Sequence, residues 1–136
     1  MVYEIELAIF GLFAGLVTPI SIYLGKKLIE PIFQLRELVS RILYSLTYYA
    51  STYSNPGITP QHRECSDVLR QHASDLESKI YLIKYPRIPA VLGLIPKKVD
   101  VLAASRELIG MSNMLFSTQN VKNIYEASVK ARKLLS

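Results

Sequence analysis

The hydrophobic pattern divides the chain near residue 25. From Leu7 to Leu24 no residue is charged, and a membrane-spanning helix needs about 20 predominantly apolar residues, with a range of about 17 to 25. Tyr3 precedes this run and Tyr23 stands at its C-terminal end, and aromatic residues are typical of the two membrane–water interfaces. We therefore predict a transmembrane helix, with its interfacial flanks, over residues 1–27.

Two other interpretations of the apolar run, a secretory signal and a buried helix, fit the sequence less well. A secretory signal has a positively charged region before its apolar segment, whereas this chain begins MVYEIE, which is acidic, and a small-x-small cleavage site is missing. A buried helix of a soluble protein is the remaining alternative. It does not explain why residues typical of an interface stand at both ends of the run.

Positive charges are distributed unequally around the predicted span. Lys26 and Lys27 are the first basic residues of the chain and follow the span directly, where they would lie at headgroup depth. Because basic flanks stay on the cytoplasmic side of a membrane, we expect the N-terminus outside and residues 28–136 in the cytoplasm. In a bacterial cell the membrane would be the inner, cytoplasmic one.

The rest of the chain repeats apolar residues at helical spacing, which predicts an all-α protein. Proline, glycine and asparagine divide it into helices at about 31–54, 60–83, 96–116 and 119–135. Thr59 is the expected N-cap of the second of these, with Pro60 as its first residue. Four amphipathic helices with short connections predict a cytoplasmic antiparallel four-helix bundle over 28–136.

Three of these helices have a predicted inward face. On the first it consists of apolar residues three or four positions apart, namely Ile32, Leu35, Val39, Ile42, Leu46, Tyr49 and Tyr53. On the second helix it consists of Cys65, Val68, Leu69, His72, Leu76, Ile80 and Ile83. On the last, Val121, Ile124, Tyr125 and Ser128 share one side. At the surface, Asp75 and Lys79 have the spacing of an ion pair within one helix.

A proline-rich segment, residues 85–96, separates the second and third of these helices; we call it the knuckle. Three prolines exclude a long regular helix, yet its sequence AVLGLI is too apolar for a solvated loop. We expect it to pack against the bundle end, the membrane surface or a neighbouring subunit. The residues expected to dock are Arg87, Leu92, Leu94, Ile95, Lys97 and Lys98.

Small residues follow one face of the predicted span. On a helix with about 100° per residue, they fall within an arc of about 140°, and they are Ala8, Gly11, Ala14, Gly15, Thr18, Ser21 and Gly25. Gly11 and Gly15 have the small-xxx-small spacing that lets two helices approach closely. This small face predicts packing between spans, or the lining of a narrow lumen in a ring of subunits.

After residue 25 the chain has 16 Lys and Arg residues against nine Asp and Glu residues, a balance of +7. A solvated surface beside a negatively charged leaflet explains this excess. Binding of nucleic acid or a nucleotide is not excluded, although the sequence has no dense basic run.

The residues that could perform chemistry are few. Cys65 is the only cysteine, so an internal disulfide is excluded. His62, Cys65 and His72 are candidate metal ligands, but ten residues span about 15 Å along a helix, so one ion cannot bridge the two histidines. No catalytic, metal-binding or cofactor-binding residue is predicted, and no cofactor is expected.

Polar residues in the predicted core are a further signal. His72 lies on an inward face, and Arg106, Ser112 and Asn113 interrupt an otherwise apolar helix. They predict either a hydrogen-bond network inside the core or a contact with a ligand or a second subunit.

Four pieces of the sequence, YSNP, VLRQHASDL, LGLIP and LIGMSN, lie between Tyr53 and Asn113. In these pieces the chain resembles a group of small, uncharacterised bacterial proteins with one N-terminal span. The resemblance covers less than half of the chain. It implies a membrane-tethered helical domain and no particular activity.

The expected architecture is also similar to that of a CRISPR-associated membrane protein that assembles into a pore and has a HEPN-like cytoplasmic part. HEPN ribonucleases carry an arginine followed, four to six residues later, by a histidine. Here Arg63 stands nine residues before His72 and Arg70 two residues before it. The resemblance therefore does not extend to the nuclease residues.

We expect a single-pass membrane protein that self-assembles through its span and bundle, acting as a pore-forming or membrane-perturbing defence effector. The alternative is an adaptor that tethers a cytoplasmic protein or nucleoprotein to the membrane. A HEPN-like nuclease relative is the lesser alternative. The expected partners are the lipid bilayer, further copies of the chain and, for an adaptor, a cytoplasmic protein.

Overall fold

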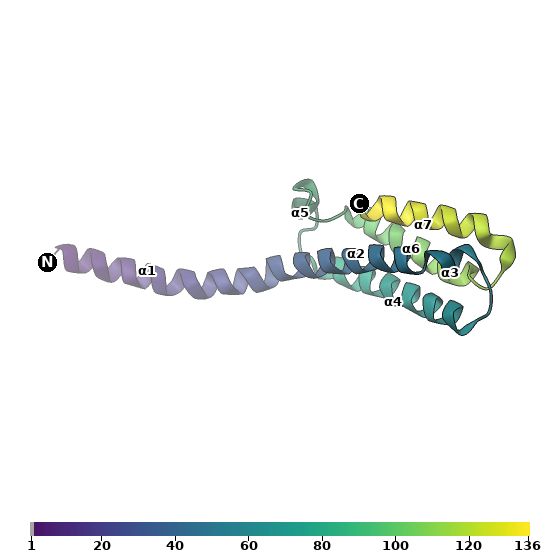
Figure 1. Ribbon diagram of the computed structural model, residues 1–136. Coiled ribbons are helices and arrows are strands. Elements are labelled where there is room, and N and C mark those ends of the chain that lie inside the picture. Colours follow the sequence, from purple (N-terminus) through teal and green to yellow (C-terminus); the bar gives the residue numbers. More distant parts are fainter. Residues whose placement is uncertain (1) are drawn as a thin grey trace.

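Residues 2–136, which the computed structural model describes, form helices joined by loops and contain no strand. The prediction of an all-helical chain with one long apolar helix at its N-terminal end is confirmed. Helix α1 (Val2–Leu24) continues through a π-helical turn, η1 (Gly25–Ile29), into α2 (Glu30–Tyr48) without a loop. This continuous helix of 47 residues is about 70 Å long, and its first half projects from the remaining helices (Figure 1).

The remaining helices surround one core, and we call residues 30–136 the helical domain. Helix α4 (Pro60–Leu82) packs between α2 and α6 (Lys98–Met114), and α6 also packs against α7 (Val121–Leu135). Consecutive long helices of the domain run in opposite directions (Figure 1). Three short helices complete the domain: α3 (Ala50–Ser54), α5 (Arg87–Val91) and the 3₁₀ turn η2 (Thr118–Asn120).

The core is made by the apolar stripe of each long helix. Its fully buried side chains include Leu35, Ile42, Leu46, Leu69, Leu76, Val101, Leu108, Met111 and Ile124. In α2 the predicted inward residues are buried, except that Ile32 is only partly buried. In α7 the predicted face is wrong for two residues, because Val121 and Tyr125 are exposed while Ala127, Ala131 and Leu135 are buried.

The predicted ends of the four domain helices coincide with the observed ones or differ from them by one or two residues, and one predicted helix is broken. A turn at Tyr49 separates α2 from α3, within the region predicted as 31–54. The prediction for the start of α4 is confirmed, because the Thr59 side chain accepts a hydrogen bond from the backbone N–H of His62 and Pro60 opens the helix.

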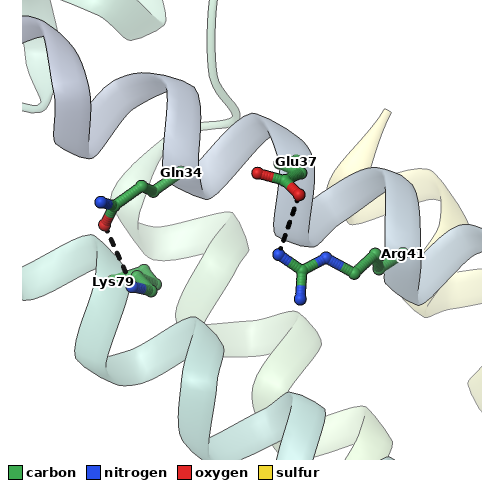
Figure 2. A network of polar contacts seen from close by, with 4 residues as sticks. All are labelled: Gln34, Glu37, Arg41 and Lys79. Atoms are coloured by element: carbon green, nitrogen blue, oxygen red, sulfur yellow. Dashed lines mark hydrogen bonds and ion pairs between the residues drawn. The ribbon is translucent and has the colours of Figure 1, made fainter.

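Helices α2 and α4 are also joined by a polar contact at their outer edge (Figure 2). Lys79 Nζ donates to Gln34 Oε1 at 3.0 Å, and on the same face of α2 Arg41 pairs with Glu37 at 3.1 Å. The predicted pair between Asp75 and Lys79 is therefore wrong. Asp75 instead accepts a hydrogen bond from Gln71 Nε2 at 2.9 Å.

Candidate membrane interface

Helix α1 has the length and composition needed to cross a membrane. Its most apolar 18-residue window has a mean hydropathy of 2.0 and none of that window is buried. Side chains such as Phe10, Leu12 and Phe13 are at least two-thirds exposed. In the described part of the chain no other helix covers them, so this apolar surface is available to lipid or to another molecule.

The small face of α1 is open as well. A Cβ atom added at Gly11, Gly15 or Gly25 would meet no atom within 4 Å. Ala8, Ala14, Thr18 and Ser21 are equally exposed. These glycines therefore do not accommodate a close neighbour within the described chain, and the small face is open to another molecule.

Pro19 interrupts the hydrogen bonding of α1 next to this face. Proline has no backbone N–H, so the carbonyl of Gly15 loses its helical partner. Thr18 Oγ1 donates to the carbonyl of Ala14 at 3.1 Å. In the single chain the Thr18 hydroxyl is thus satisfied within its own helix, and the Gly15 carbonyl remains available to a neighbouring donor.

Lysines and tyrosines alternate where α1 ends and α4 returns. Lys27 Nζ lies 4.8 Å from the centre of the Tyr23 ring, and Lys98 Nζ lies 4.5 Å from that of Tyr81. A hollow of about 560 Å³ joins the two groups, and it is lined by Tyr23, Leu24, Lys26, Lys27, Leu28, Pro31, Tyr81, Leu82 and Lys84. The predicted headgroup residues Lys26 and Lys27 therefore share one surface with the end of α4, which the sequence pattern did not indicate.

The knuckle folds as a short helix with a tight turn after it. Helix α5 ends at Val91, and two residues later Gly93 has a φ of +72°, the left-handed conformation that favours glycine. Gly93 N–H donates to the Ala90 carbonyl at 3.1 Å, and Leu94 N–H donates to the Pro89 carbonyl at 2.9 Å. This pair of bonds is a Schellman motif, and it fixes the direction of the chain as it leaves α5.

The predicted docking residues of the knuckle divide into two groups. Arg87, Leu92, Leu94 and Lys97 are exposed and Lys98 is partly buried. Ile95 does not belong with them, because it is 5% exposed and packs in the domain core. Sequence reasoning missed three exposed apolar residues here, Ile88, Val91 and Val99. The spacing of Ile88 and Val91 with Leu92 around the short helix is the signal that could have identified these two, whereas Val99 lies at the start of α6.

The predicted polar cluster is organised by a residue that the sequence did not single out. Arg70 on α4 donates from Nε to Ser112 Oγ at 3.2 Å and from Nη2 to Asn113 Oδ1 at 2.8 Å. Ser66 Oγ donates to the Ser112 carbonyl at 3.2 Å. Arg106 is exposed, so the prediction that it lies in a core network is wrong. The network joins α4 to α6 at the domain surface.

The two histidines are held by structural contacts. His62 has Thr59 Oγ1 2.6 Å from Nδ1 and the Asn55 carbonyl 2.6 Å from Nε2, so it braces the turn before α4. His72 Nε2 lies 2.8 Å from Ser45 Oγ on α2. Burial lowers the pKa of His72, with a further lowering by Arg41 and an opposing effect of Asp75. Its imidazole is therefore neutral at pH 7.

Cys65 is fully buried, and burial, assisted by Glu64, raises the pKa of its thiol to about 12. Because the thiolate is the reactive form of cysteine, this side chain is a core residue and not a nucleophile. Among residues 2–136 no group of three or more His, Cys, Asp or Glu side chains is arranged to hold a metal ion.

Comparison with known proteins adds no relative, since a scan against protein-family models and searches of curated proteins and of solved structures all give no match.

Proposed function

We propose that the protein is a single-pass membrane protein in which α1 crosses the bilayer and the helical domain, an antiparallel four-helix bundle, stands against one membrane surface. The observation that carries the proposal is the uncharged, unburied stretch of α1 from Leu7 to Leu24. Eighteen residues of helix measure about 27 Å, close to the hydrocarbon thickness of about 30 Å.

The same proposal places the N-terminus outside and the domain in the cytoplasm of a bacterial inner membrane. The absence of basic residues before Lys26 supports this orientation. The test uses Cys65→Ser as a background, because it removes the only thiol. In intact spheroplasts, a membrane-impermeant maleimide should label Glu4→Cys and leave Ser51→Cys unlabelled. Labelling of Ser51→Cys alone would reverse the orientation, and labelling of both would exclude a span.

We further propose that the span assembles with further copies of itself through the small face. The open space at Gly11 and Gly15 supports this, because small residues let spans approach to van der Waals contact. In native mass spectrometry from mild detergent, the wild type should form a defined oligomer and Gly11→Leu/Gly15→Leu should weaken it. Ile9→Leu/Val17→Leu, on the larger apolar face, is the control. A wild type that stays monomeric would overturn self-assembly, and an unchanged double-leucine oligomer would assign assembly to the domain.

A ring of such spans with the small face inward would enclose a lumen. We therefore propose that the assembly permeabilises a membrane in defence. Release of a small dye from vesicles that contain the wild type, and loss of that release in Gly11→Leu/Gly15→Leu, are the expected results. If the vesicles retain the dye although the wild type is fully assembled, the proposed pore is overturned and only the oligomer remains.

A tethering adaptor is the second candidate, and the outer face of α2 favours it. Tyr44 and Tyr48 are exposed and stacked, with ring centres 6.0 Å apart, and Phe33 is exposed on the same helix. Aromatic residues are enriched at protein interfaces. Cross-linking from native membranes should capture a cytoplasmic protein that Tyr44→Ser/Tyr48→Ser no longer binds. Recovery of the chain alone would favour self-assembly.

A relation to HEPN nucleases is the weakest of the three proposals, because both histidines already have structural partners. His62→Ala, His72→Ala and Cys65→Ala should each leave the membrane phenotype intact if the domain still folds. Loss of the phenotype in a folded variant would favour an enzyme.

A further inference from the structure

The knuckle presents apolar side chains that nothing in residues 2–136 covers. Val91 is 86% exposed, Leu92 68% and Ile88 62%, and Val99 at the start of α6 is 76% exposed. A solvated surface element rarely groups four large aliphatic side chains. These residues therefore form a surface made to contact another phase or another molecule.

This surface is held rigidly. Pro89 and Ile95 are buried on the opposite side of the knuckle, and the Schellman turn at Gly93 closes the end of α5. Because the inward side is occupied by these two residues, the aliphatic side chains of α5 cannot turn into the core. They point outward as a consequence of the fold.

Positive charge surrounds the aliphatic side chains. A cavity of about 320 Å³ between α5 and the start of α6 has an apolar lining with three cations around it, and it is formed by Pro86, Arg87, Ala90, Val91, Lys97, Lys98 and Val99. From Ser78 to Val99 the chain contains five Lys and Arg residues and no Asp or Glu. An anionic partner with an apolar interior matches this combination.

The position of the knuckle identifies that partner. It lies at the end of the helical domain from which α1 leaves (Figure 1). Contacts connect the two places without a break, because Lys98 lies over the Tyr81 ring and Tyr81 lines the hollow that also contains Tyr23 and Lys27. If α1 spans the bilayer, the knuckle is at the level of the headgroups.

We propose that the knuckle is a second membrane contact, which docks on an anionic phospholipid bilayer. Ile88, Val91 and Leu92 enter the boundary between headgroups and acyl chains, and Lys84, Arg87, Lys97 and Lys98 bind the lipid phosphates. Interfacial elements combine these two residue types in this way. A nucleic-acid site would not need the exposed aliphatic side chains. The inference rests on the proposed span, and it adds that the domain is fixed to the leaflet at two points.

The absence of tryptophan from the chain makes a direct test possible. Val91→Trp places a single fluorophore on the knuckle, and Ile58→Trp places one at an exposed site at the far end of the domain. Each full-length variant is reconstituted into vesicles of phosphatidylcholine and phosphatidylglycerol with lipids brominated close to the headgroup. The expected result is at least twofold quenching of Val91→Trp and none of Ile58→Trp. Equal exposure of both fluorophores to solvent would overturn the inference.

A third tryptophan variant separates failure of the knuckle contact from failure of the span. Leu12→Trp reports on the span, and lipids brominated deep in the acyl chains should quench it. Quenching of Leu12→Trp without quenching of Val91→Trp overturns the second contact and leaves the proposed span intact, whereas an unquenched Leu12→Trp overturns the span itself. A blue-shifted Val91→Trp that bromolipid does not quench would mean that a second copy covers the knuckle, which also overturns lipid docking.

The charge requirement is tested in the Val91→Trp background. Lys84→Gln/Arg87→Gln/Lys97→Gln/Lys98→Gln should reduce quenching at least twofold in the anionic vesicles, and vesicles of phosphatidylcholine alone should reduce it similarly. Arg63→Gln/Lys122→Gln, which removes cations from the far end of the domain, is the control and should change nothing. If the extent of quenching is the same in neutral and anionic vesicles and is unchanged by the four glutamine substitutions, the role of the lipid phosphates is overturned.

Discussion

Helices α1 and α2 belong to one uninterrupted helix, yet they meet their surroundings in opposite ways. In α1 no described side chain is buried and no charge occurs from Leu7 to Leu24. In α2 five apolar residues form one buried stripe, and charged residues such as Glu37 and Arg41 lie on the outer side. Apolar content alone therefore does not distinguish a core helix from a lipid-facing one. The distribution of apolar residues around the axis does.

The largest effect is expected from a core truncation in α2. Leu46 is completely buried, so Leu46→Ala should lower the free energy of unfolding of the domain by about 2–5 kcal/mol. Leu12→Ala in α1 should leave it unchanged, because Leu12 touches no part of the domain core. Urea unfolding of the detergent-solubilised chain, followed by circular dichroism, measures both. A comparable loss in Leu12→Ala would mean that α1 packs on the domain.

A charge in the middle of α1 should have the next largest effect. Leu16→Lys places an ammonium near the centre of the proposed span, at a cost of about 3 kcal/mol for insertion. Tyr44→Lys, on the exposed side of α2, is the matched control. The fraction that stays in carbonate-washed membranes should fall for Leu16→Lys only. Equal retention of both variants would contradict a membrane-spanning α1.

Gly93 and Gly110, both outside the long helix, differ in whether the backbone conformation requires a glycine. Gly93→Ala should destabilise the domain by about 1–2 kcal/mol, because its positive φ strains any side chain. Gly110 lies inside α6 with open space at its Cβ position, so Gly110→Ala should stabilise it by about 0.5–1 kcal/mol. The midpoint of urea-induced unfolding measures the stability change in both variants. A destabilising Gly110→Ala would indicate that another subunit packs there.

The smallest effect concerns pH. The folded pKa of His72 lies below its ordinary value of about 6.5. Between these two pKa values the unfolded chain binds more protons, so stability is highest above about pH 6.5 and decreases as the pH falls toward the folded pKa. His72→Gln should therefore lose less stability than the wild type between about pH 7.5 and 5.5. An identical pH dependence would contradict the lowered pKa.

The features that follow from local spacing could be predicted from the sequence. Thr59 and Pro60 begin α4 because capping depends on neighbours within one turn. The inward residues of α2 follow from their three-to-four spacing. The exposed and uncharged stretch of α1 from Leu7 to Leu24 likewise follows from the composition of one segment.

The features that depend on distant segments could not be predicted. Arg70 meets Asn113, 43 positions later, only because α4 and α6 pack together. Lys79 bonds to Gln34 on α2 instead of the nearer Asp75, since the side chain of Lys79 reaches the neighbouring helix. Ile95 is buried although it follows exposed Leu92 and Leu94. In each case the partner is chosen by tertiary packing, which local periodicity does not encode.

The π-helical turn Gly25–Ile29 has a mechanical consequence. Because no loop separates α1 from α2, α1 and the helical domain move together. A rotation of α1 about its axis therefore turns the domain by the same angle. Each residue of helix advances the azimuth by about 100°, so deletion or insertion of a single residue in this turn would swing the small face away from its present direction relative to the knuckle. The turn thereby sets the angle about the helix axis between the small face, which we propose packs against other spans, and the knuckle, which we propose contacts lipid.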